Sequence, residues 1–207
     1  MLFRSLGSTS SVLTIHPSLP VKSMQELVAL SKRTPGGLSY GSNGAGTSSH
    51  LTGAMFAHLS GAVLTHIPYK GAAPAINALI SGEVPLGFPG VNSAMPMLRA
   101  GKLRALAVST LKRSPVLPDL PTIDSVYPGV DVDQWFLLLA PTGTPPNVIA
   151  RLNAEMIKGL QHADVKAFMV REGIDPVGST PAEAAAFYDR EITKFATIVK
   201  VAAVKPE

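Results

Sequence analysis

The segment that best suits ligand binding is a loop at residues 40–50, which reads YGSNGAGTSSH. It ends a strand-like run and opens a helix-like one, so backbone N–H groups and the positive end of a helix dipole surround the same space. Such an arrangement suits a carboxylate or a phosphate. The candidate ligand-binding residues of this loop are Ser42, Asn43, Gly44, Gly46, Thr47, Ser48 and His50.

The glycine spacing of this loop does not match the nucleotide-binding motifs. It reads Gly-x-x-Gly-x-Gly rather than the dinucleotide-binding order, and no Gly-x4-Gly-Lys-Ser/Thr motif occurs in the chain. We therefore predict no nucleotide and no other cofactor. In the purely structural alternative, the loop is a flexible turn that Thr47 caps.

Two further strand ends carry polar residues. Tyr69, Lys70 and Gly71 follow one strand-like run, and Asn92 with Ser93 follows the next. Because open α/β sheets bind ligands at the carboxyl ends of their strands, these residues join the candidate site. Tyr69 would supply a hydroxyl or an aromatic wall, and Lys70 a positive charge. In the alternative interpretation, Tyr69 packs, Lys70 is solvated, and Asn92 and Ser93 cap the following turn.

The charge distribution favours an anionic ligand. The formal net charge of the whole chain is +4, but between residues 27 and 118 eight basic residues accompany a single acidic one, Glu83. The basic residues are dispersed and no nucleic-acid-binding motif accompanies them, so we expect a small organic anion as partner and no nucleic acid. A basic, solvated surface without a ligand is the plainer alternative.

Catalytic and metal-binding patterns are sparse. The sequence has no Gly-x-Ser-x-Gly motif, no His-Glu-x-x-His motif, no paired acids in the basic region and no cysteine. His50 and His58 are eight residues apart on an expected helix, which separates them by about 12 Å and is too far for one metal ion. We predict no catalytic residue and no metal site.

Strand-like and helix-like runs alternate along the chain, which is typical of a largely parallel sheet covered by helices. Ser23 and Thr180 each open a capping box, and Thr144 before Pro145 also predicts a helix start. The sequence thus predicts an α/β fold. The expected strands are 12–16, 38–42, 63–67, 84–88, 103–109, 132–140 and 175–177, and the expected helices are 23–33, 48–59, 73–81, 93–100, 144–160, 164–172 and 180–201.

Several segments in order resemble one protein family. HPSLPVKSMQELVAL, LSYGSNGAGTSSHLTG, HIPYKGAAPAINALISGEV, AGKLRALAVST, WFLLLAPTGTPP and the ending VKPE are similar to the tripartite tricarboxylate transporter solute receptors, also called the Bug family. The resemblance implies a periplasmic binding protein of the type II-like fold. Its two lobes would close on a carboxylate, often a dicarboxylate, and deliver it to the membrane components of the transporter.

The same resemblance implies a periplasmic location and a division of the chain. Residues 14–132 correspond to a second ligand-binding lobe, and residues 1–13 with 133–207 to the remaining part of a first lobe that lacks its N-terminal part. The first residues of the sequence as given contain no signal peptide. Missing strands would leave an unpaired edge and exposed apolar surface, so we expect self-association through the first lobe.

Solute identity does not follow from the resemblance, because Pro89 and Gly90 stand where many members carry an acidic residue. Two alternatives of other classes also stay open. One is an enzyme that acts on a small carboxylate at the same anion site, which turnover of a carboxylate ester or acid would reveal. The other is an interaction or sensor protein that uses the receptor fold, which a protein partner captured without a small ligand would reveal.

Overall fold

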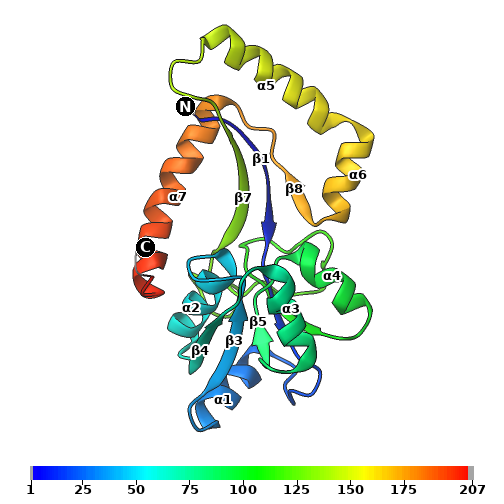
Figure 1. Cartoon of the computed structure of the whole chain (residues 1–207), viewed down its shortest axis with the longest axis vertical. Coiled ribbons are helices and arrows are strands. Elements are labelled where there is room, and N and C mark those ends of the chain that lie inside the picture. Colours follow the sequence, from blue (N-terminus) through cyan, green and yellow to red (C-terminus); the bar gives the residue numbers. More distant parts are fainter. Residues whose placement is uncertain (1, 205–207) are drawn as a thin grey trace.

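The computed structural model describes residues 2–204, which fold around two β-sheets (Figure 1). The larger sheet has the strand order β4-β3-β5-β2-β6, and the smaller one has the order β7-β1-β8. The α/β fold predicted from the alternating pattern is confirmed. The strands are β1 (Leu2–Ser10), β2 (Val12–Ile15), β3 (Leu38–Ser42), β4 (Leu64–Pro68), β5 (Leu86–Gly87), β6 (Arg104–Val108), β7 (Asp133–Leu139) and β8 (Ile174–Pro176).

The helices begin where the sequence supplies a cap. Ser23 Oγ accepts a hydrogen bond from Glu26 N at 3.1 Å, and Thr180 and Glu183 form both bonds of a capping box. Both predicted helix starts are confirmed, but only the capping box at Thr180 is complete, because Glu26 Oε2 accepts from Lys22 N and not from Ser23 N. The helices are α1 (Met24–Arg33), α2 (Ser48–Ser60), α3 (Ala72–Ser81), α4 (Val91–Arg99), α5 (Pro146–Gln161), α6 (Ala163–Arg171) and α7 (Pro181–Val201).

Two predicted helix starts were wrong. Helix α5 begins at Pro146 with Pro145 as its N-cap, because Thr144 Oγ1 donates instead to Pro141 O at 2.9 Å and closes a turn. Helix α4 begins at Val91, with a glycine as its N-cap, two residues earlier than expected. Residues 92 and 93 therefore lie inside the first turn of α4 and do not cap it.

The N-terminal strand β1 was not predicted from the sequence. It pairs antiparallel with β7 along almost its whole length and with β8 at residues 7–9. Gly7 lies at a close approach, since a Cβ there would sit 2.7 Å from Asp175 O. Strand β1 continues directly into β2 of the larger sheet, so it forms one of the two crossings between the sheets.

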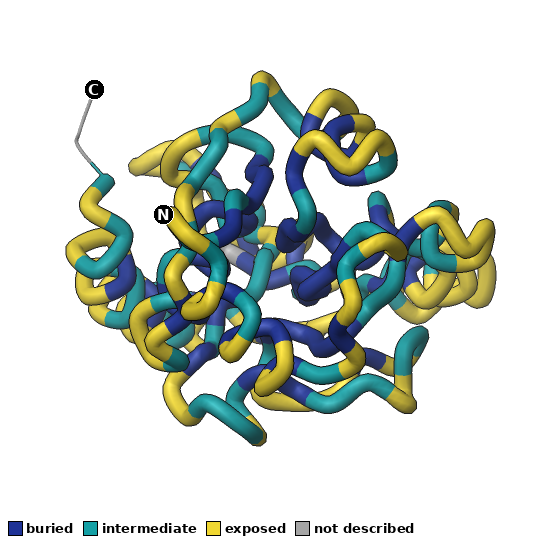
Figure 2. The backbone as a smooth tube through the Cα atoms, turned by 90° about the horizontal axis from the view of Figure 1, so that it is seen from below, coloured by how far each residue is buried: buried dark blue, intermediate teal, exposed yellow. Residues whose placement is uncertain are grey.

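The largest hydrophobic core surrounds the five-stranded sheet. Leu13, Phe56 and Phe88 are fully buried in it, and each such side chain contributes about 2 kcal/mol through burial. Figure 2 shows the buried segments on the inside and the exposed ones on the outer turns of the helices. Ile198 and Phe195, near the end of α7, also pack on this core.

Two features of the structure bear on the two-lobe division proposed from the sequence, namely the position of β2 and the packing of α7. Val12 and Leu13, which precede the proposed start of the second lobe at 14, belong to strand β2 of the larger sheet. Helix α7 contacts both β1 of the smaller sheet and α2 beside the larger sheet. Segment 133–207 therefore does not pack with one lobe alone.

Candidate functional site

The three predicted loops lie at one edge of the larger sheet. Strands β3 and β4 run parallel, as do β3 and β5, so their carboxyl ends point the same way. Two backbone bonds join the first two loops, from Tyr69 N to Ser42 O at 2.9 Å and from Gly71 N to Asn43 O at 3.1 Å. This edge faces the part of the molecule that holds β1, β7 and β8 (Figure 1). The structure thus brings the predicted residues together at the place where such sheets bind ligands.

Hydroxyl groups inside the first loop mainly fix its shape. Ser42 is buried, and its Oγ accepts a hydrogen bond from Gly44 N at 3.1 Å. Thr47 Oγ1 donates to Gly44 O at 2.7 Å, and Ser49 Oγ accepts from Asn43 N at 2.9 Å. Ser42 and Thr47 therefore position the loop backbone, as does Ser49, which the sequence analysis did not single out.

The glycines of this loop adopt backbone angles that other residues avoid. Gly44 has φ 134° and Gly46 has φ 74°, both in the region that favours glycine. At the end of the loop, the first N–H groups of α2, at residues 48–50, have no carbonyl partner within the helix. These groups and the positive end of the α2 dipole are the donors that a carboxylate would meet.

His50 lies under the loop and stacks on His66 of β4. The two rings are 3.8 Å apart and nearly parallel. Gly46 N donates to His50 Nδ1 at 3.0 Å, and Ser42 Oγ lies 2.6 Å from His66 Nε2. Burial lowers the pKa of both histidines, and burial together with the neighbouring His50 lowers the pKa of His66 to about 4. The pair is therefore uncharged at neutral pH and supports the loop without adding charge.

Residues of the second loop differ in what they can offer a ligand. Tyr69 donates its hydroxyl hydrogen to Glu83 Oε1 at 2.7 Å, and burial together with this carboxylate raises the pKa of Tyr69 to about 12. This bond engages Glu83, the acidic residue of the basic region. Lys70 is exposed at the start of the turn before α3. Lys70 therefore leaves its charge in solvent, whereas the Tyr69 hydroxyl is held by Glu83.

The third loop opens helix α4 near the crossing between the sheets. Asn92 Oδ1 accepts a hydrogen bond from Ser93 N at 2.8 Å, and the side chain of Asn92 is exposed. A Cβ on Gly90 would lie 3.4 Å from Gln134 Nε2 of β7. Gln134 Nε2 in turn lies 3.5 Å from Ser11 Oγ. The crossing segments therefore border this loop and bring Gln134, a residue that the sequence analysis missed, close to Gly90.

Behind the first loop is a cavity of about 380 Å³, lined by His50, His58 and His66 with apolar residues of α2 and α7. Among residues 2–204, no group of three or more His, Asp or Glu side chains has an arrangement that could hold a metal ion. Three histidine side chains therefore line this cavity, but they are not arranged to bind a metal ion. Within the same described part of the chain, no helix is long and apolar enough to cross a membrane.

Comparison with known proteins gives the family. The model of the tripartite tricarboxylate transporter family receptor matches residues 3–204. The chain belongs to this family. The resemblance that the ordered segments indicated is thereby confirmed, and members of this receptor family are solute-binding proteins rather than enzymes.

Individual members of the receptor family resemble the chain over most of its length. Protein BugT of Bordetella pertussis is 33% identical over 201 residues, which are 97% of this chain and 62% of that protein. The structure of Rpa4515 from R. palustris with adipate is 31% identical to this chain and has a TM-score of 0.90. The match covers 100% of this chain and 69% of that one. MatC from Rhodopseudomonas palustris with bound malate is 28% identical, with a TM-score of 0.81, over 94% of this chain and 68% of that one.

These comparisons also fix the fold and the relative length. The similar structures are periplasmic binding proteins, so the predicted type II-like α/β receptor fold is confirmed. A substrate-binding protein of an amino acid ABC transporter, 12% identical with a TM-score of 0.52, shares the fold alone. The chain spans about 60% of the length of the curated relatives that it matches.

Proposed function

We propose that the chain captures a small carboxylate, most suitably a dicarboxylate, at the edge formed by the loops after β3, β4 and β5. The observation that carries this proposal is the convergence of three strand ends and the starts of α2, α3 and α4 at one place. At the start of each of these helices, the first N–H groups and the positive end of the helix dipole would point toward a bound anion. We expect the ligand to be bound and released unchanged, as in the receptor family to which the chain belongs.

Charge in this lobe supports an anion over a neutral or cationic solute. Glu83, the acidic residue between residues 27 and 118, is hydrogen-bonded to Tyr69, whereas Lys70 beside the loops is exposed. A field of one sign concentrates ligands of the opposite sign at the loops. The adipate and malate in the similar structures are both dicarboxylates, which agrees with this charge.

The biological setting that we propose is the one of the receptor family. The chain would deliver its solute to the membrane components of a tripartite tricarboxylate transporter, and it would act in the periplasm. Family membership and the periplasmic binding proteins among the similar structures support this setting. An enzyme that uses the same site is disfavoured because the members of the receptor family are solute-binding proteins.

Substitution of Gly44 by valine tests the site directly. A Cβ at this position would meet Tyr69 O at 3.4 Å, and the φ of 134° is strained for valine, so the loop must shift. We expect calorimetry with adipate to show at least about tenfold weaker binding by Gly44→Val.

Gly101→Val is the matched control, because Gly101 has φ 66° and open space around it, in a turn away from the loops. It strains the backbone similarly and should bind adipate as the unaltered chain does. Equal adipate affinity in Gly44→Val and the unaltered chain would remove the loop from the site.

A further inference from the structure

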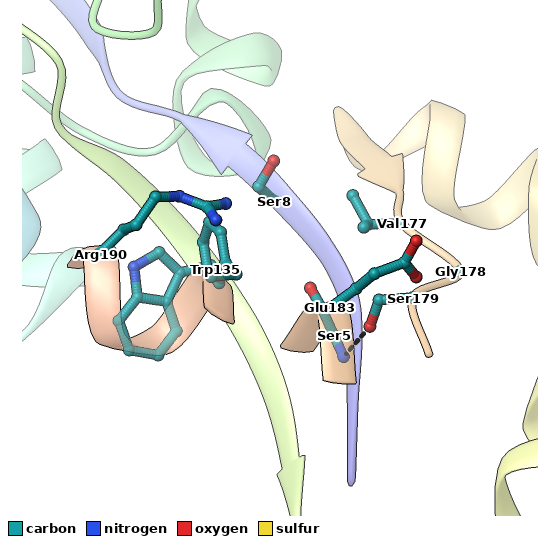
Figure 3. A pocket seen from close by; sticks show the side chains of 9 residues that line it. Ser5, Ser8, Trp135, Val177, Gly178, Ser179, Glu183 and Arg190 are labelled. Carbon is teal, nitrogen blue, oxygen red and sulfur yellow. Dashed lines mark hydrogen bonds between the residues drawn. The ribbon is translucent and has the colours of Figure 1, made fainter. Parts of the chain in front are cut away.

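A second cavity, of about 330 Å³, lies in the other half of the molecule (Figure 3). Its walls come from four places that are distant in the sequence: β1, β7, the connection between β8 and α7, and α7 itself. None of the residues of the three loops lines it. It is therefore separate from the carboxylate site proposed above.

The lining combines an apolar floor with free polar donors. Trp135 and Phe187 lie edge to face, with ring centroids 6.0 Å apart, and Val177 completes the apolar part. Ser5 and Ser8 of β1 present hydroxyl groups for which no hydrogen bond is recorded within residues 2–204. A ligand that fits these walls has an apolar body and a polar end that accepts hydrogen bonds.

Arg190 brings a positive charge to the cavity. Its guanidinium lies 5.9 Å from the Phe187 ring centroid and forms no ion pair with any described residue. In Figure 3 its side chain extends across the cavity toward Ser8. A guanidinium has five N–H donors in a planar fork that matches a carboxylate. The cavity therefore holds an unpaired cation whose side chain points toward the Ser8 hydroxyl group.

A second arginine lies behind the wall. Arg4 is fully buried, and its Nε and Nη2 have no hydrogen-bond partner within the described residues. Gly178 lines the cavity, and a Cβ there would be 3.1 Å from Arg4 Nη2, so only a glycine backbone separates the two. A buried charge without a counter-ion is costly. An anion in the cavity would face Arg190 directly and be attracted by Arg4 through the wall.

Glu183 limits the charge of the ligand. Its carboxylate accepts hydrogen bonds from Thr180 N at 2.7 Å and from Thr180 Oγ1 at 2.9 Å, and the first of these bonds lowers its pKa most. Glu183 thus stays ionised at one side of the cavity. A ligand with a second negative charge would be repelled there, which favours a single carboxylate.

We propose that this cavity is a second binding site, for a monocarboxylate with an aromatic or branched apolar body. The carboxylate binds Arg190 and Ser8, and the apolar body lies against Trp135 and Phe187. The two sites then differ in ligand class: dicarboxylates bind at the loops, and aromatic monocarboxylates bind here.

Trp135 makes the test direct, because it is the one tryptophan of the sequence and lines this cavity. Titration of the purified chain with benzoate should change the tryptophan emission until it saturates. Because Arg190→Gln removes the charged hydrogen-bonding partner of the carboxylate, it should weaken benzoate binding at least about tenfold. Absence of a saturable change, or an unaltered affinity in Arg190→Gln, would overturn the proposal.

Arg171→Gln is the matched control. Arg171 also lies over an aromatic ring, that of Phe168 at 5.3 Å, but it is outside the cavity. It should bind benzoate as the unaltered chain does, and equal weakening in both variants would contradict the site. Gly44→Val should also leave benzoate binding unaltered, so failure of this proposal and failure of the loop proposal are distinguishable.

Discussion

At the scale of single residues, the polar side chains of the first loop hold its backbone in place through hydrogen bonds to Gly44 and Asn43. The glycine and hydroxyl pattern of residues 42–48 predicted a turn that encloses an anion, and Gly44 and Gly46 do have positive φ angles. His66 could not be foreseen as the partner of His50, because the parallel register of β3 and β4 brings it there. Long-range register is not encoded in local spacing.

The stacked histidine pair predicts how stability depends on pH. Folding lowers the pKa of His66 from 6.5 to about 4, so the unfolded chain binds more protons between these values. The stability from this side chain is present above pH 6.5 and is lost as pH falls toward 4. Each pKa unit corresponds to about 1.4 kcal/mol, so protonation of His66 costs the folded state at most about 3.4 kcal/mol.

Substitution of His66 should flatten this dependence. In urea unfolding followed from pH 7 to pH 4, His66→Gln should lose less free energy of unfolding than the unaltered chain. His162→Gln is the control, since His162 is exposed at the end of α5. A His66→Gln chain that loses as much stability as the unaltered one would show that the neutral pair does not support the loop.

At the scale of elements, capping motifs and alternation predicted most strands and helices, and β1 is the main exception. Its sequence, LFRSLGSTS, has no run of alternating apolar residues. It is a strand because β7 and β8 pair with its two edges, and such tertiary pairing overrides local propensity. Thr144 failed as a cap for a comparable reason, since Pro141 O competed for its hydroxyl.

Strand β7 predicts how the chain behaves in solution. It pairs only with β1 among the described strands, so one of its edges is open, and Phe136 and Leu139 on it are 43% and 64% exposed. Open apolar edges associate. We therefore expect light scattering to show concentration-dependent association of the chain, which Leu139→Lys should reduce because a charge on the edge opposes pairing.

Leu111→Lys is the control for this effect. Leu111 is 58% exposed after β6, away from the open edge. It should associate as the unaltered chain does. A chain that remains monomeric at all concentrations, or equal effects of both substitutions, would contradict association through β7.

At the scale of the whole molecule, the sequence predicted the receptor fold and one of the two proposed sites. The first site is built from consecutive strand ends of one sheet, which sequence patterns can place side by side. The cavity at Trp135 needs residues near positions 5, 135, 178 and 190 at once, and no local pattern joins them. Helix α7 links both, since it lines that cavity and its C-terminal neighbour Val204 lies 3.7 Å from where a Cβ of Gly46 would be.

The central claim, capture of dicarboxylates at the three loops, is tested most directly by amide NMR of the isotope-labelled chain. Titration with adipate or malate should shift the signals of residues 43–48, 70–71 and 91–93 until they saturate, even if the affinity is weak. Glucose and a diamine should leave these signals unaltered. Absence of shifts with both dicarboxylates, or shifts confined to residues outside the loops, would contradict the account.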